Sequence, residues 1–230
     1  MIYFTGDTHG ESGRFSENVL IGEDAPKAGD HLIISGDFGF VFAQRGTVAY
    51  FEERDRLNAL AELPYTILFV DGNHENFDRL EGEYAVEEWC GGKVHRIRPN
   101  VLHLMRGQVF TIEGKKIFTM GGAYSIDKYM RREGFSWWPS EMPSNDEYRE
   151  ATANLRAHNN EVDIIVTHTA PREIVYAMGS APDPHEEELN GFFDWIAHEI
   201  KFEKWFFGHW HRDNEYYSRF RALYFDVVRA

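Results

Sequence analysis

Residues 1–11 read MIYFTGDTHGE, and the pattern in this stretch recurs along the chain and decides its fold. A short apolar run, Met1 to Phe4, stops just before Gly6, and an acid and an imidazole, Asp7 and His9, follow between glycines. Such a run is too short for an amphipathic helix and is typical of a strand that is buried on both faces. A surface turn can carry these residues by chance, whereas a metal site at the end of a strand requires them.

Four further apolar runs of strand length end in glycine, aspartate, asparagine or histidine. They are Leu32–Ile34, Thr66–Val70, Asp163–Val166 and Trp205–Phe207. Helix-like segments lie at residues 51–63, 144–158 and 184–200, and hairpin-like stretches span residues 94–120 and 214–228. The alternation of strands and helices predicts an α/β fold. We expect one domain over residues 1–230, with an irregular insertion at about residues 121–143 that is too long for a passive connection.

The composition narrows the class of protein. With 43% hydrophobic and 15% aromatic residues among 230, the chain is typical of a globular protein with a well-packed core. The net charge of −14 disfavours long duplex nucleic acid as a partner, because the protein repels the phosphate backbone. The one cysteine, Cys90, cannot form an intramolecular disulfide, and no apolar run approaches the roughly 18 residues of a membrane span. We therefore expect a cytoplasmic protein without a membrane partner.

Polar side chains of metal-binding type follow all five predicted strands. They are Asp7 and His9, then Asp37, then Asn73 and His74, then His168, and finally His209 and His211. Because ligands of α/β proteins bind outside the carboxyl ends of the strands, we expect these side chains to meet at one edge. Asp-x-His and His-x-His would direct both side chains to the same side of an extended backbone, and the neighbouring glycines would let the chain turn without adding bulk. Carboxylate, imidazole and amide groups together suit manganese, iron or zinc, and two such ions about 3.5–4 Å apart would clamp a phosphate.

The five segments also resemble a known family. GDTHG, GDFG, DGNHE, VTHTAP and GHWH, in this order between residues 6 and 211, are similar to the five blocks of the calcineurin-like metallophosphoesterase superfamily. The resemblance implies a four-layer α/β/β/α sandwich of two mixed sheets with flanking helices. It also implies hydrolysis of a phosphoester by in-line attack of a metal-bound hydroxide.

The resemblance implies a role for each residue of the cluster. Asp7, His9 and His211 would bind one divalent metal ion, Asn73, His168 and His209 would bind a second, and Asp37 would bridge the two. His74 would contact the phosphoryl group and act as the general acid, for which a pKa near neutrality is suited. We expect manganese in both positions, with iron, zinc or nickel as alternatives.

The sequence departs from the protein Ser/Thr phosphatases of this superfamily. Where those enzymes carry an acid and an arginine in the second block, this chain has Phe40 and Val41, and Asp71 replaces the arginine of the third block. Two phosphate-binding arginines are therefore absent, which counts against a protein substrate. We expect a small or medium organic phosphate, with a nucleotide-type compound as one form of it, and both monoesters and diesters remain open. The alternatives are a nuclease or phosphodiesterase acting on short oligonucleotides, a protein Ser/Thr phosphatase, and a non-catalytic metal-binding scaffold, although a scaffold would be expected to have lost ligands.

Other cations could hold the substrate in place of the absent arginines. Arg131 and Arg132 lie in the insertion, and Arg172 follows His168 by four residues. An arginine fork suits a phosphate. Trp137 and Trp138 either stack on a ring of the substrate or pack the insertion onto the domain. We expect Trp210, between two predicted ligands, to point away from the metals.

Overall fold

The structure, a computed structural model, describes residues 1–16, 20 and 25–229. Within these ranges the strands form a seven-stranded sheet of order β13-β1-β2-β3-β6-β5-β4 and a six-stranded sheet of order β11-β12-β10-β9-β8-β7. The first sheet comprises β1 (Ile2–Thr5), β2 (His31–Ile34), β3 (Thr66–Phe69), β4 (Val86–Trp89), β5 (Gly92–Arg98), β6 (Val101–Leu104) and β13 (Val228–Arg229). The second comprises β7 (Gln108–Ile112), β8 (Lys115–Met120), β9 (Ile164–Thr167), β10 (Lys204–Phe207), β11 (Asn214–Tyr216) and β12 (Phe220–Ala222).

Both sheets are mixed. Strands β1, β2, β3 and β6 run parallel at the centre of the first sheet, and β8, β9, β10 and β12 run parallel in the second. The other pairings are antiparallel, including the β7–β8 hairpin, which lies in the stretch 94–120 predicted as hairpin-like and turns through Glu113 and Gly114. Both turn residues have a positive φ, which a tight hairpin turn requires.

The strands alternate between two hydrophobic layers. Phe4 of β1 and Phe206 of β10 stack between the two sheets, with ring centroids 4.0 Å apart. Tyr3, one residue away, lies on the opposite face of the first sheet, in a cluster with Leu57 and Leu80. This alternation is the period of two that strand geometry imposes, and each fully buried side chain of this size contributes roughly 1.5–3 kcal/mol of burial free energy.

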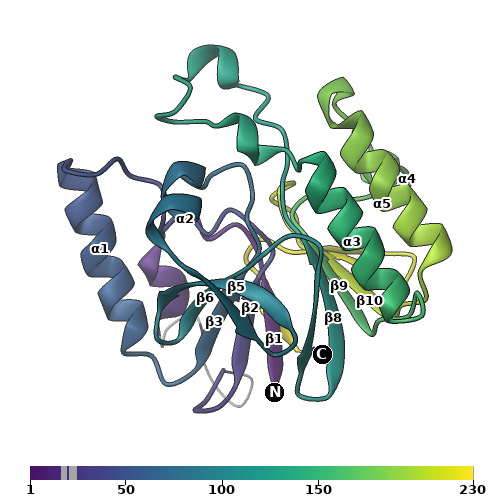
Figure 1. Ribbon diagram of the computed structural model, residues 1–230, viewed down its shortest axis with the longest axis horizontal. Helices are drawn as coiled ribbons and strands as arrows, with labels where there is room; N and C mark the ends of the chain where they lie inside the picture. The colour runs from purple at the N-terminus through teal and green to yellow at the C-terminus, as the bar shows by residue number, and fades with distance from the viewer. Residues whose placement is uncertain (17–19, 21–24, 230) are drawn as a thin grey trace.

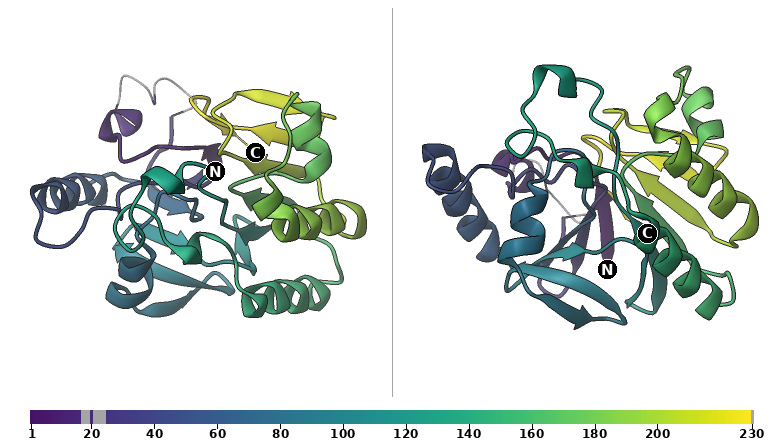
Figure 2. Two further views of the ribbon diagram at one scale, coloured as in Figure 1. Left: turned by 90° about the horizontal axis from the view of Figure 1, so that it is seen from above. Right: turned by 45° about the horizontal axis from the view of Figure 1, so that its top comes forward.

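Helices cover the outer face of each sheet. They are α1 (Val48–Ala61), α2 (Phe77–Glu83), α3 (Asn145–Ala157), α4 (Arg172–Ala177) and α5 (Glu187–Glu199). In Figures 1 and 2, α1 and α2 lie on one side of the molecule and α3, α4 and α5 on the other. The layers run helix, sheet, sheet, helix, so the predicted four-layer α/β/β/α sandwich is confirmed. None of the helices in the described ranges has the length and apolar character that a bilayer crossing requires.

The predicted helices form, with shifted ends. Helix α1 begins at Val48, three residues before the predicted start, because the side chain of Thr47 accepts a hydrogen bond from the Tyr50 amide and caps it. Helix α3 begins with a capping box between Ser144 and Glu147. The segment expected as one helix from Pro184 is a short 3₁₀ turn, η5 (Pro184–Glu186), followed by α5.

The insertion is ordered along its length and is held at both ends. Its start is fixed by the buried Glu186, which accepts a hydrogen bond from the Tyr124 amide at 2.8 Å. Near its end, Trp138 is buried and its indole N–H donates to Asp78 at 2.9 Å. Between them the chain forms the 3₁₀ turns η3 (Lys128–Met130) and η4 (Pro139–Glu141), and in Figure 1 it arches over the top of the molecule. The insertion is therefore a fixed wall above the carboxyl ends of the central strands.

Candidate metal centre

The loops that follow the five predicted strands carry the site, and in three of them the candidate ligands have a left-handed rather than an extended backbone. Positive φ angles occur at Asp7 (47°), His9 (46°), Asp37 (47°), His209 (65°) and His211 (48°). The expectation that Asp-x-His and His-x-His would lie on an extended backbone is therefore wrong. The strand ends at Thr5, and the left-handed turns redirect the chain so that both side chains of each pair still face the site.

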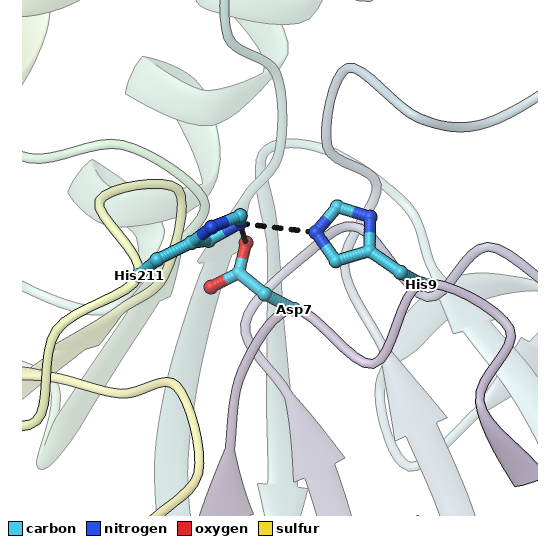
Figure 3. A group of neighbouring side chains, drawn as sticks. All are labelled: Asp7, His9 and His211. Atoms are coloured by element: carbon cyan, nitrogen blue, oxygen red, sulfur yellow. Dashed lines mark hydrogen bonds and ion pairs between the residues drawn. The ribbon is translucent and has the colours of Figure 1, made fainter.

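The first group of potential ligands comprises Asp7, His9 and His211, which point toward one another in Figure 3. The Nε2 atoms of His9 and His211 are 3.0 Å apart, and Nε2 of His211 is 3.8 Å from Oδ1 of Asp7. Asp7 is buried, and the His209 amide donates to both of its carboxylate oxygens at 3.0 Å. Two imidazole nitrogens and a carboxylate oxygen thus converge on one point, as they do around a divalent ion.

The second group of potential ligands comprises Asn73, His168 and His209, and it tests more directly whether a cation fits. His168 is fully buried, and its Nδ1 lies 2.9 Å from the Ser35 carbonyl oxygen, which can only accept a hydrogen bond. The proton of a neutral ring is therefore on Nδ1, and the lone pair of Nε2 faces Asp37 Oδ1 at 3.3 Å and Asn73 Oδ1 at 3.2 Å. Three acceptor atoms then meet without a proton between them, so a bound metal ion or an additional proton on His168 must compensate.

Asp37 lies between the two groups. One of its oxygens is 3.3 Å from His168 Nε2, and the other is 3.8 Å from His9 Nε2. The backbone N–H of His74 donates to Oδ1 at 2.9 Å and fixes the carboxylate. His209 lies beside His168, with ring centroids 5.0 Å apart. The carboxylate therefore faces both sets of potential ligands, as a bridge requires.

Glycines make this close approach of the chains possible. A Cβ on Gly72 would lie 2.1 Å from Oδ1 of Asp37 and 2.7 Å from Nε2 of His168. A Cβ on Gly208 would lie 2.6 Å from Oδ2 of Asp7. Any side chain at these two positions would displace potential ligands, so the glycines do keep bulk away from the site.

Burial and the neighbouring charges shift the pKa values of the site residues in opposite directions. Burial disfavours a charge on His168, but the carboxylates of Asp37 and Asp7 outweigh it and raise the pKa of His168 to about 10. Burial raises the pKa of Asp7 to about 8 and lowers the pKa of His9 to about 4. Burial, with His168 as the next cause, lowers the pKa of His209 to about 3. Without a bound ion, His168 therefore carries the positive charge of the site while His9 and His209 stay neutral, and a bound cation would take over that charge.

A cavity of about 650 Å³ opens over this cluster. Its floor includes Asp37, Asn73, His74 and several of the other potential ligands. The insertion forms one wall through Tyr124, Ile126, Asp127 and Arg131, and the loop at residues 181–186, together with Trp210, forms the other. A space of this size accommodates a small organic molecule beyond its reacting group.

Comparison with known proteins assigns the family. A sequence model described as calcineurin-like phosphoesterase matches residues 1–213. The chain belongs to the calcineurin-like phosphoesterase family. It is a metal-dependent phosphoesterase that uses divalent metals, and its clustered histidines and carboxylates are suited to hold them. A crystal structure of a phosphopantetheinyl hydrolase from Mycobacterium tuberculosis is similar, at 17% identity over 97% of this chain and 89% of that chain, with a TM-score of 0.47. A search of curated proteins found no significant match.

The phosphoesterase does not bring all of the predicted substrate residues to the cavity. Arg131 lines it, and its Nη2 lies 3.1 Å from Nε2 of His74. Arg132 is exposed and lies outside the lining, with its guanidinium over Phe135. Arg172 pairs with Asp194 at 3.3 Å and lines a different cavity beside α4 and α5. Of the three arginines, Arg131 alone lies in the lining of this cavity.

The structure also shows where the tryptophans near the site lie. Trp138 packs into the core of the first sheet, and Trp137 lies under the ammonium group of Lys128 outside the cavity, so neither is placed to stack on a substrate. Trp210 was expected to point away from the metals, but it lines the cavity while part of its ring packs on the second sheet. It does so because the left-handed backbone at His209 and His211 turns this loop over the site.

Two further buried side chains, Glu75 and Ser125, support the site. Glu75 accepts hydrogen bonds from the Phe38 amide at 2.7 Å and the Gly72 amide at 2.6 Å, so it ties the second and third loops together. Ser125 accepts from Nδ2 of Asn73 at 3.2 Å, which turns the amide oxygen toward His168. Glu75 stands in the DGNHE block, and that position was the only signal in the sequence for its role.

Proposed function

We propose that this phosphoesterase hydrolyses a small or medium organic phosphate in the 650 Å³ cavity, using two divalent metal ions and His74 as general acid. The observation that carries the proposal is the meeting of three acceptor atoms at His168, Asp37 and Asn73, next to the converging imidazoles of His9 and His211. Such an arrangement is unfavourable in the absence of cations and is suited to a pair of them. In this proposal the whole chain acts as one cytoplasmic domain, and the insertion serves as its substrate wall.

The ligand sets follow the two groups of the site. Asp7, His9 and His211 would hold one ion, Asn73, His168 and His209 the other, and Asp37 both. When bound, such ions lower the pKa of a water molecule and polarise the phosphoryl group. The mixture of carboxylate, amide and imidazole groups suits manganese, with iron, zinc or nickel as alternatives.

Arg131 and His74 form the part of the site that would contact the substrate. A guanidinium group only donates hydrogen bonds, so in the ligand-free state His74 accepts at Nε2 and carries its proton on Nδ1. Burial, together with Arg131, lowers the pKa of His74, against the opposing effect of Asp37. A phosphoryl oxygen would draw Arg131 away from His74, and Nε2 could then hold the proton that the leaving oxygen takes. Arg131 would thereby replace the arginines that Val41 and Asp71 displace.

Two substitutions test these roles. Asp37→Asn should abolish most turnover of p-nitrophenyl phosphate or bis-p-nitrophenyl phosphate with Mn²⁺ and should also reduce the metal content, because it removes the bridging charge. His74→Ala should abolish most turnover but keep the metal, because His74 is not a ligand in this proposal. Activity is measured on the purified variants, and metal is measured by mass spectrometry.

The wild-type protein sets the baseline for both variants. If it hydrolyses neither ester with manganese, iron, zinc or nickel, the proposed function is wrong, and the non-catalytic scaffold becomes the better reading. If His74→Ala loses metal as well as activity, the assignment of His74 as an acid rather than a ligand is wrong.

A further inference from the structure

The cavity offers little positive charge from the protein itself. Among the described residues that line it, Arg131 is the only lysine or arginine. Its guanidinium is bonded to the carboxylate of Asp127 at 2.8 Å, so much of that charge is already compensated. Lys128 lies close by, but its ammonium group is held between the rings of Tyr124 and Trp137, at 3.8 and 4.7 Å from their centroids, and it does not line the cavity.

The opposite wall is acidic. Asp183 and Glu186 line the cavity from the loop before α5. Asp183 is paired with the exposed ring of His185 at 2.8 Å, whereas Glu186 is buried and accepts a hydrogen bond from the Tyr124 amide. A phosphate oxygen outside the metal-binding floor would therefore face the carboxylates of Asp127 and Asp183 against the guanidinium of Arg131 alone, and each pair of like charges disfavours binding.

The rest of the wall is apolar. Ile126, Ala181, Pro182, Pro184 and the ring of Trp210 line the cavity around the carboxylates. Ile126 is 71% exposed although it lines the cavity, so its side chain is available to a ligand. Apolar surface of this kind favours an uncharged organic group next to the phosphoryl centre.

We infer that the substrate is a phosphodiester of two uncharged alcohols, whose phosphoryl group carries a single negative charge. A monoester carries up to a second negative charge near neutral pH, because its second ionisation has a pKa of about 6. That charge needs a further cation, and Arg131, the one lysine or arginine among the described residues of the lining, is already paired with Asp127. The inference rests on the proposed function and narrows its substrate class. It also disfavours nucleoside polyphosphates and oligonucleotides, which carry additional phosphates into the acidic part of the cavity.

The test compares two esters with the same leaving group. For the manganese-loaded protein, kcat/KM for bis-p-nitrophenyl phosphate should exceed kcat/KM for p-nitrophenyl phosphate by at least tenfold. Binding to His74→Ala, measured by calorimetry, should show the same order of affinity without turnover. A preference for the monoester, or equal values, overturns this inference alone. Inactivity on both esters overturns the proposed function and this inference with it.

A charge placed on the apolar wall gives a second, independent measurement. Ile126→Lys adds a cation at the rim of the cavity and should raise the ratio of monoester to diester kcat/KM at least fivefold. The matched control is Tyr129→Lys, an 82% exposed position of the same insertion that does not line the cavity, which should leave the ratio unchanged. An unchanged ratio in Ile126→Lys, or an equal change in both variants, contradicts the charge argument.

Discussion

Five of the seven potential ligands adopt a left-handed backbone conformation, which an L-residue disfavours. Asp7, His9, Asp37, His209 and His211 all have φ between 46° and 65°. A left-handed conformation costs an L-residue roughly 1–2 kcal/mol relative to the right-handed one, and glycine is the residue that adopts it freely. Strain of this kind persists where a functional side chain is needed at that point in space. At these positions the protein is therefore less stable than it would be with glycine.

His9 allows this strain to be measured. In the absence of metal, His9→Gly should be more stable than His9→Ala by about 1 kcal/mol, because glycine has no Cβ to oppose φ of 46°. Both variants should lose metal equally, so the comparison isolates the backbone. The measurement is urea denaturation in the presence of a chelator. Glu52 is an exposed position inside α1, and there the alanine variant should instead be more stable than the glycine variant by about 1 kcal/mol. The same order at both positions would contradict the argument from strain.

At the scale of single residues, the sequence predicts the ligand types but not their conformation. Asp37 and His168 could be singled out because each directly follows an apolar run, and a strand end is where α/β proteins bind ligands. Their backbone angles depend on how the loops pack against one another, for example Gly72 against Asp37, and a single sequence does not contain that contact. Glu75 could not be separated from an ordinary solvated acid, because only the fold buries it.

A second buried polar network lies on the outer face of β5 and β6, away from the cavity. His95 and His103 are directly opposite each other on these strands, with their Nδ1 atoms 3.1 Å apart. His103 Nε2 lies 3.1 Å from Asp71, which also accepts hydrogen bonds from Nε of Arg106 at 2.8 Å and from Nη2 at 2.6 Å. Because Asp71 immediately precedes the third ligand loop, this network holds that loop onto the sheet and joins it through Arg106 to the carbonyl groups of Ser140 and Glu141 in the insertion.

His95 should make the stability of the protein depend on pH. Burial, and then the neighbouring His103, lower the pKa of His95 to about 4, whereas an unfolded histidine titrates near 6.5. Between these values the unfolded state binds more protons, so this contribution is fully present above about pH 6.5 and is lost as the pH falls toward 4. The expected loss between pH 7 and pH 5 is about 2 kcal/mol.

The substitution His95→Gln should remove most of that pH dependence. The free energy of unfolding is measured in urea at pH 7 and at pH 5, for the variant and for the wild-type protein. His198→Gln, at an exposed position of α5, reports what the same substitution does where the side chain is not buried. If His95→Gln loses as much stability between the two pH values as the wild-type protein, other buried groups, with His9 and His209 among them, account for the dependence instead.

At the scale of elements, the length of a helix decides whether it can be predicted from the sequence. The long segments that became α1, α3 and α5 show periodicity or a capping start, and Ser144 with Glu147 marks the start of α3. Helices α2 and α4 were not predicted, since seven and six residues are too few to establish a period of 3.6. Loop segments such as the insertion take their path from tertiary anchors, here Trp138 on Asp78 and Tyr124 on Glu186, which no local pattern encodes.

At the scale of the molecule, the site joins the two sheets. Asp7, Asp37 and Asn73 follow strands β1, β2 and β3 of the first sheet, whereas His168 and His209 follow β9 and β10 of the second. The carboxylate of Asp37 contacts His168 across this boundary, and the Gly208 amide donates to the His168 carbonyl at 2.9 Å to hold the two second-sheet loops together. Ions bound here would crosslink the layers of the sandwich as well as serve the chemistry.

Removal of metal should therefore destabilise the whole protein. A ligand at a hundredfold excess over its Kd stabilises the folded state by about 2.7 kcal/mol, and for a protein of this size that corresponds to roughly 5–10 °C in Tm. We expect the Tm in Mn²⁺ to exceed the Tm in a chelator by at least that amount, measured by calorimetry. His74→Ala should keep this difference and Asp37→Asn should lose most of it, because only Asp37 faces both groups of ligands. An equal difference in the wild-type protein and in Asp37→Asn would place the stabilising ion elsewhere on the molecule, and the two sheets would then be held by their shared apolar layer alone.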